Sequence, residues 1–196
     1  MSKWFEKEHE GSSNIMYSRI RLARNWEAFP FPSRLDRDES SRLVDSLKDG
    51  LSELRDGSGE PLGYRSLEEI KSADRIALRE RRILNRAAVE KTGAAGLFLS
   101  EDESESLVLG VDDHIRLQLL APGLSLEQLW KRADQIDDEI NQHFSYAFDE
   151  KYGYLTAFPT MLQQLCRKCK DLRSNTRSFG HTEGSGGCSA QGQATH

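Results

Sequence analysis

The chain has 196 residues, a length that suits one ordinary domain, and 37% of them are hydrophobic while 30% are charged. Its net charge of −5 argues against a general nucleic-acid binder, because such proteins need a surplus of cations to neutralise phosphates. No apolar stretch approaches the roughly 18 residues of a membrane span, and the charged first residues lack the apolar core of a secretory signal. The three cysteines fit a reducing cytoplasm better than a disulfide scaffold, so we expect a cytoplasmic protein with no membrane and no nucleic-acid partner.

The first half of the chain predicts one strand followed by two helices. Alternating apolar and polar side chains favour a strand or extended segment over residues 15–24. A helix capped by Asp36 or Asp38 is expected to run to about Leu54, because leucines recur along it at three- and four-residue steps. Asp74 can cap a second helix. The apolar side chains of that helix would be Ile76, Leu78, Ile83 and Leu84.

The second half predicts antiparallel strands and one long helix. Two short apolar runs, 94–100 and 106–111, flank an acidic turn and therefore favour a hairpin. Residues 114–119 alternate again and can add a third strand. After a Pro-Gly break, apolar side chains at helical spacing predict a helix of about 20 residues, with Ser125 and Gln128 as its capping box. The expected fold class is therefore α+β.

The end of the chain differs in composition from the rest. Residues 161–177 are basic and polar, and residues 178–196 are rich in Gly, Ser, Thr and Gln. We expect 161–196 to form a tail, disordered over 178–196, because it cannot bury enough apolar surface to offset the entropy of ordering. A CxxC motif in this tail could nominally bind zinc or act as a redox pair, but the spacing and the sequence context favour accidental cysteines. The potential ligands are Cys166, Cys169, His181 and Cys188.

Arginines gather in two places along the chain. The first cluster is Arg19, Arg21 and Arg24, and the second is Arg75, Arg79, Arg81, Arg82 and Arg86. A planar guanidinium grips phosphate or carboxylate in two-point contact, which is one reason to choose arginine over lysine. A solvated helix face explains the second cluster without any function. Between two predicted strands, Asp112–His114 places an acidic pair beside a histidine, which is also compatible with a simple polar turn.

A family resemblance links these features. The run Tyr17–Asn25, followed by Phe29–Pro32, resembles the N-terminal signature of the ATP:guanido phosphotransferases and is most similar to that of bacterial protein-arginine kinases. Four further stretches resemble the family in the same order. They are Asp74–Leu84, Leu97–Glu103, Asp112–Gln118 and Asp137–Thr160. The resemblance implies an incomplete guanidino-kinase domain over residues 1–160: a helical N-terminal part, the first strands of an antiparallel sheet, and a long helix.

The resemblance also implies an activity, transfer of the γ-phosphoryl group of ATP to arginine side chains of protein substrates with Mg²⁺ present. In this family arginine side chains hold the ATP phosphates, and a carboxylate aligns the substrate guanidinium. By position, the nucleotide-binding residues are Tyr17, Ser18, Arg19, Ile20, Arg21 and Arg116. Asp112 stands where the family has the catalytic Glu, and Arg82 stands where it has a His that contacts ATP. No site for a protein-bound metal ion is expected.

Some positions depart from the family pattern. Phe158 replaces a Cys near the guanidino group, and the pattern stops directly after Pro159 and Thr160. Residues 161–196 can be interpreted either as a frameshifted continuation or as a divergent end. An alternative function follows: an inactive fragment or pseudokinase that binds nucleotide or protein and self-associates through an exposed sheet edge.

Overall fold

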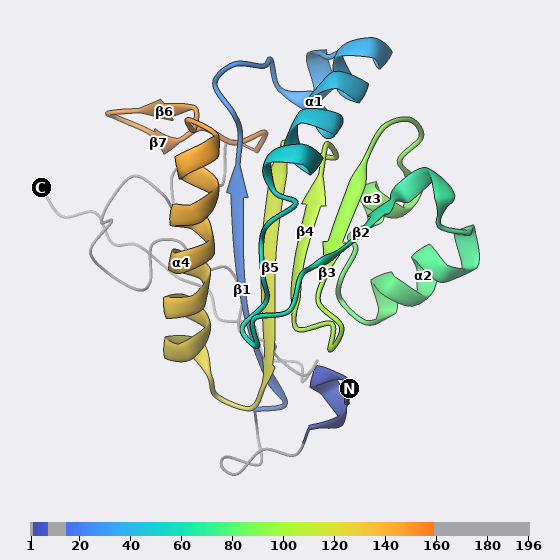
Figure 1. Ribbon diagram of the computed structural model, residues 1–196, viewed down its shortest axis with the longest axis vertical. Coiled ribbons are helices and arrows are strands. Elements are labelled where there is room, and N and C mark those ends of the chain that lie inside the picture. The colour runs from blue at the N-terminus through green and yellow to red at the C-terminus, as the bar shows by residue number, and fades with distance from the viewer. Residues whose placement is uncertain (1, 8–14, 159–196) are drawn as a thin grey trace, which may run out of the picture.

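The computed structural model describes residues 2–7 and 15–158, which fold around a five-stranded antiparallel sheet of order β1-β5-β4-β3-β2 (Figure 1). Its strands are β1 (Tyr17–Arg24), β2 (Gly63–Ser66), β3 (Gly96–Leu99), β4 (Glu105–Leu109) and β5 (Ile115–Pro122). The α-helices are α1 (Arg37–Gly50), α2 (Ser72–Glu80), α3 (Arg86–Glu90) and α4 (Leu126–His143). Short 3-10 helices are η1 (Trp4–Glu6), η2 (Pro32–Arg34) and η3 (Leu67–Glu69), and a small hairpin pairs β6 (Phe148–Asp149) with β7 (Gly153–Tyr154).

The two faces of the sheet are covered differently. On one face, α1 and α4 bury a large core in which Leu47 and Ile136 pack with Ile20 of β1 and other strand residues. On the other face, α2 and α3 bury a smaller core whose strand residues, Leu97 and Val108, come from β3 and β4. Figure 1 shows α4 alongside β1 and α2 and α3 at the opposite side of the molecule. The side chains of β1 and β5 on the second face therefore lie outside both cores.

The structure confirms the predicted α+β class and the regular elements of the sequence analysis. The strand expected over 15–24 is β1, and the hairpin over 94–111 is β3 and β4. The third strand expected at 114–119 is β5, which pairs with both β4 and β1. The long helix is α4. These elements have strong local periodicity, and periodicity is the signal on which the predictions relied.

The predicted cap of α1 is confirmed, with Asp36 as the capping residue of the two proposed. Other predicted caps and boundaries are wrong. Helix α1 ends at Gly50 instead of about Leu54. Asp74 lies in the first turn of α2 and does not cap it. Ser125 forms no capping box, because its hydroxyl donates to the carbonyl of Pro122 at 2.9 Å.

The second helix is also shorter than predicted. It ends at Glu80 because Arg82 takes a left-handed backbone conformation with φ 70°. Ile83 and Leu84 therefore follow the helix, although both are buried as expected of apolar residues. No pattern in the sequence indicated β2, α3, β6 or β7, which are too short to show a period.

No helix in the described part of the chain is long and apolar enough to cross a membrane. The predicted tail over 161–196, with its CxxC motif, lies outside the described residues.

Candidate functional site

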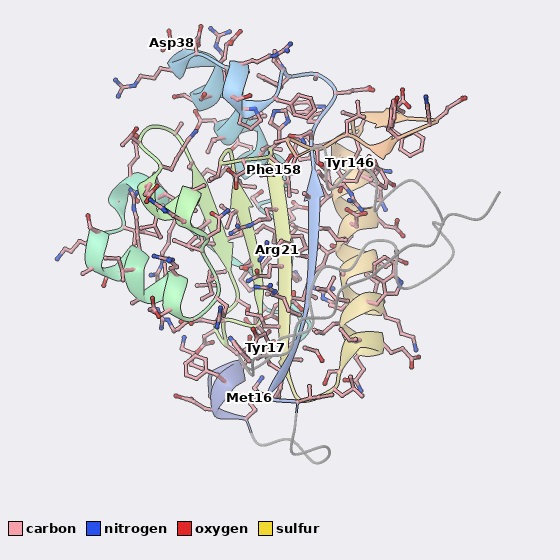
Figure 2. The ribbon with its side chains drawn as sticks, turned by 180° about the vertical axis from the view of Figure 1, so that it is seen from behind. Met16, Tyr17, Arg21, Asp38, Tyr146 and Phe158 are labelled. Carbon is pink, nitrogen blue, oxygen red and sulfur yellow. The ribbon has the colours of Figure 1, made fainter. Side chains whose placement is uncertain are left out.

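A pocket of about 310 Å³ lies on the sheet face opposite α4, between β1, β5 and the end of α2. Its lining contains five arginines and one carboxylate. The lining residues are Arg19, Arg21, Arg79, Glu80, Arg82, Leu84, Asn85, Arg116 and Gln118. We call it the arginine pocket. Figure 2 looks onto this face and shows Arg21 near its centre.

Strand pairing brings the arginines of β1 and β5 together. Arg21 of β1 lies opposite Gln118 of β5, and residues directly opposite in an antiparallel pair share a face. Arg19 and Arg116 are each two residues away on the same strands, so they share this face as well. The intervening Ile20 points to the core under α4. The alternation seen in the sequence thus separates an arginine face from an apolar face.

Arg116 is the most enclosed cation of the pocket, with 9% of its surface exposed. A terminal nitrogen of its guanidinium donates to the carbonyl of Ile83 at 3.2 Å, and its Nε is buried with no hydrogen-bond partner in the described residues. Burial lowers the pKa of Arg116 to about 10, the Asp112 carboxylate opposes this effect, and the Arg19 cation adds to it. A bound anion would compensate this buried charge and supply an acceptor for Nε.

The pocket holds more cationic than anionic groups. Burial lowers the pKa of Arg19, and the neighbouring Arg82 lowers it further against an opposing effect of Tyr17. In the part of the chain that the structure describes, no carboxylate forms an ion pair with Arg79, Arg82 or Arg116. Guanidinium groups held together in this way favour a ligand with several negative charges, such as a polyphosphate.

Arg79 and Arg82 reach the pocket because α2 ends beside it. Arg82 has φ 70°, which is uncommon for a residue other than glycine. Gln118 of β5 donates from Nε2 to the carbonyl oxygen of Arg82 at 2.5 Å. Together with the bond from Arg116 to the next carbonyl, this attaches the turn after α2 to β5 at two points.

The other arginines of the second sequence cluster have structural partners. Arg75 donates to backbone carbonyls of four residues around α2 and α3. Arg81 pairs with Glu103 at 3.0 Å, and the exposed Arg86 pairs with Glu90 at 2.7 Å. The solvated-face interpretation therefore suits Arg86, whereas Arg79 and Arg82 belong to the pocket.

The predicted catalytic carboxylate lies next to the arginine pocket. Asn85, which lines the pocket, donates from Nδ2 to Oδ2 of Asp112 at 2.8 Å. The charge of Asp112 also acts on the buried guanidinium of Arg116. One side chain therefore connects this carboxylate to the pocket lining.

Asp113 and His114 are buried and bind neighbouring backbone and side-chain groups. Asp113 accepts a 2.7 Å hydrogen bond from Asn25, and burial raises its pKa. His114 accepts at Nδ1 from the backbone N–H of Trp26 at 2.9 Å, and its Nε2 lies 2.8 Å from the Pro30 carbonyl. A carbonyl only accepts, so Nε2 carries the proton and the ring is neutral; burial lowers its pKa. These two residues attach the start of β5 to the segment that follows β1.

The structure does not bring every predicted nucleotide-binding side chain to the pocket. Ser18 is buried on the opposite face, where its hydroxyl donates to the Gly123 carbonyl at 2.7 Å and accepts from the Ser125 N–H at 2.9 Å. Ile20 is fully buried in the large core. Tyr17 stacks near Trp4 at a ring distance of 5.8 Å, toward the end of the sheet (Figure 2). Strand alternation accounts for the positions of Ser18 and Ile20.

Five lining residues of the pocket were absent from the sequence-based set of site residues: Arg79, Glu80, Leu84, Asn85 and Gln118. Gln118 follows Arg116 at strand spacing, which is a signal that could have placed it on the same face. Arg79 precedes Arg82 by three residues, which is neighbouring spacing on a helix. Nothing in the sequence connects Asn85 to Asp112, because 27 residues separate them.

The described residues contain no group of three or more His, Cys, Asp or Glu side chains that could hold a metal ion. The carboxylate that lines the arginine pocket belongs to Glu80. A pocket with this donor set fits a phosphate-bearing ligand, and it fits a divalent cation that arrives already bound to phosphates.

Comparison with known proteins gives consistent results. The model of the ATP:guanido phosphotransferase, C-terminal catalytic domain, matches residues 43–164. The protein-arginine kinase of Symbiobacterium thermophilum is 36% identical over 160 residues, which make up 81% of this chain and 45% of that protein. That of Bacillus subtilis is 36% identical over 161 residues, 82% of this chain and 44% of that protein. The chain thus spans about half the length of these curated relatives.

Two solved structures share the fold. The duplicated taurocyamine kinase of Schistosoma mansoni, bound to transition state analog components, has a TM-score of 0.68 at 24% identity and covers 76% of this chain and 22% of that chain. A lombricine kinase has a TM-score of 0.64 at 17% identity and covers 74% of this chain and 44% of that chain. At these identities the likeness concerns the fold.

Proposed function

This chain belongs to the ATP:guanido phosphotransferase family, and we propose that it acts as a phosphotransferase of the protein-arginine kinase type. In this proposal the terminal phosphoryl group of ATP passes to an arginine side chain of a protein substrate. The observation that carries the proposal is the arginine pocket, which gathers five cations beside the carboxylate of Asp112. The cytoplasmic location remains a prediction from the sequence.

The arginine pocket binds the phosphates of ATP in this proposal. Arg19, Arg21 and Arg116 contact phosphate oxygens through charge-assisted hydrogen bonds, and Arg79 and Arg82 add contacts from the end of α2. This arrangement replaces the glycine-rich loop that many nucleotide-binding proteins use. Mg²⁺ enters as part of the substrate Mg·ATP, because in such sites phosphate oxygens supply much of its coordination.

The proposed reaction is balanced by one proton transfer. The bond between the γ-phosphorus and its bridging oxygen breaks, and a guanidinium nitrogen of the substrate arginine bonds to that phosphorus. ADP leaves, and in this proposal the carboxylate of Asp112 accepts the proton that the nitrogen gives up. Alignment and neutralisation of charge on the transferring group account for most of the catalysis expected here.

The test is formation of phosphoarginine. The chain is incubated with an arginine-rich, serine-free peptide and Mg·ATP carrying a labelled γ-phosphate, and the product is treated with acid. We expect a label on the peptide that acid removes, since a phosphorus–nitrogen bond is labile there. The Asp112→Asn variant should bind nucleotide but transfer little label. A wild-type chain that binds Mg·ATP without any transfer would instead support the inactive alternative.

Self-association is a separate proposal about the sheet. In the described part of the chain β1 and β2 form its two edges, and edge strands offer backbone groups for pairing with another chain. Light scattering coupled to size exclusion measures this directly. A mass of twice the chain's own at micromolar concentration supports association, and a monomer argues against it.

A further inference from the structure

We propose that Asn85 is a positioning residue that holds the carboxylate of Asp112 toward the substrate guanidinium. This inference rests on the proposed function, since it gives Asp112 the role described above. It goes beyond that function because the proposed reaction gives Asn85 no part, and only the folded structure brings its side chain to Asp112.

The orientation of the Asn85 amide is determined by two hydrogen bonds. Its Oδ1 accepts from the backbone N–H of Ala88 at 2.9 Å and thereby caps α3, and its Nδ2 donates to Asp112 at 2.8 Å. Exchanging the oxygen and nitrogen would set a donor against a donor and an acceptor against an acceptor. The cap therefore also fixes the direction in which the amide donates.

The backbone that carries Asn85 is itself attached to the strand that follows Asp112. Gln118 and Arg116 of β5 donate to the carbonyls of Arg82 and Ile83, which precede Asn85 by three and two residues. With the contact to Asp112, three side-chain hydrogen bonds connect this turn to β5 and the segment preceding it. A carboxylate held in this way has little freedom to rotate away from the pocket.

The length of Asp112 makes such support important. Aspartate is shorter by one methylene than the glutamate to which this position corresponds in the family resemblance, so its carboxylate depends more on its neighbours for placement. Displacement of a reacting group by about 1 Å can lower a rate about a hundredfold. An amide that donates to one carboxylate oxygen fixes the group and leaves the other oxygen for the substrate.

The test separates positioning from capping with the Asn85→Ser variant. Serine remains a strong N-cap for α3, but its hydroxyl is too short to replace the amide at Asp112. We measure the rate of phosphoarginine formation, the affinity for Mg·ATP by calorimetry, and the affinity for the arginine peptide in the presence of Mg·ADP. We expect the rate of phosphoarginine formation to fall about ten- to hundredfold. The affinity for Mg·ATP should fall much less, by a factor at least about ten times smaller.

A double-mutant cycle of Asn85 and Asp112 distinguishes positioning of Asp112 from a merely structural role of Asn85. If Asn85 acts through Asp112, Asn85→Ser causes no further loss of rate or peptide affinity in the Asp112→Asn background. Multiplicative losses in the two variants would overturn the proposal. Should Asn85→Ser fold poorly, Asn85→Thr also caps α3 and is too short to donate to Asp112, so the same cycle applies.

The outcomes distinguish this inference from the proposed function. A wild-type chain that transfers label or binds the peptide, with Asn85→Ser unchanged, overturns the positioning role alone. A wild-type chain that neither transfers label nor binds the peptide overturns the proposed function and this inference with it.

Discussion

The side-chain amide of Gln118 donates a 2.5 Å hydrogen bond to the backbone carbonyl of Arg82. Arg82 lies in the turn after α2 and has a left-handed backbone conformation. This bond connects a strand of the sheet to the backbone that presents Arg82 and, three residues later, Asn85. The strained turn and the arginine pocket are therefore parts of one arrangement. Strain of this kind persists where surrounding contacts enforce it.

The first prediction separates the backbone of Arg82 from its side chain. Arg82→Ala and Arg82→Gly both remove the guanidinium, so both should weaken Mg·ATP binding by about tenfold or more. Their stabilities should differ, because the left-handed conformation costs alanine about 1–2 kcal/mol and glycine almost nothing. After allowance for the greater freedom of unfolded glycine, Arg82→Gly should be more stable by about 0.5–1 kcal/mol in urea unfolding. An Arg82→Ala protein at least as stable as Arg82→Gly would contradict this account of the turn.

The second prediction concerns phosphate binding by β1. Arg21→Ala should lose about 1.5–3 kcal/mol of Mg·ATP binding energy, which is about 10- to 150-fold in Kd, because a charge-assisted hydrogen bond to phosphate disappears. Arg86→Ala is the matched control, since that arginine is exposed and pairs with Glu90 outside the pocket. Calorimetry at two salt concentrations should show a weaker salt dependence for Arg21→Ala alone. Equal Mg·ATP affinities of Arg21→Ala and Arg86→Ala would show that the phosphates do not bind in this pocket.

The third prediction concerns the length of the catalytic side chain. Asp112→Glu should keep at least the wild-type rate of phosphoarginine formation, because it restores the residue found at this position in the family resemblance. The longer side chain should also depend less on Asn85, so Asn85→Ser should cost less in the Asp112→Glu background. Rates of labelled phosphate transfer in the four proteins test both points. A marked drop for Asp112→Glu, in a chain shown to be active, would count against Asp112 as the substrate carboxylate.

Local pattern predicted the parts of the fold whose signals repeat along the chain. Alternation in β1 separates Arg19 and Arg21 from Ile20, and apolar spacing locates α4, so both could be inferred without the structure. The end of α2 could not, because Arg82 is held in its conformation by Gln118 from a strand 36 residues away.

The same distinction holds at the candidate site. The family resemblance pointed to Arg19, Arg21 and Arg116, and the structure places all three on one pocket. It also pointed to Ser18, whose hydroxyl instead bonds the backbone of the turn between β5 and α4. A motif identifies a segment, whereas the face that each side chain occupies follows from strand pairing.

The last prediction uses His114, the buried histidine two residues after Asp112. His114 is neutral in the fold, where its Nδ1 accepts from the N–H of Trp26, and burial lowers its pKa below the usual value. In the unfolded chain the same imidazole takes up a proton near pH 6.5. Below about that pH the unfolded state therefore binds more protons than the folded state, and the free energy of unfolding falls as the pH falls.

The comparison that isolates this effect is between the wild type and His114→Gln. Glutamine can still donate toward the Pro30 carbonyl, but it does not titrate, so the variant should be less stable at pH 7.5 and lose less stability on going to pH 5.5. Urea unfolding of both proteins at the two pH values gives the four free energies needed. Groups such as Asp113 titrate in both proteins, so their contribution cancels in the difference between them. Equal losses of stability in the two proteins would mean that His114 is protonated as readily in the fold as in the unfolded chain, against the neutral ring that its two hydrogen bonds require.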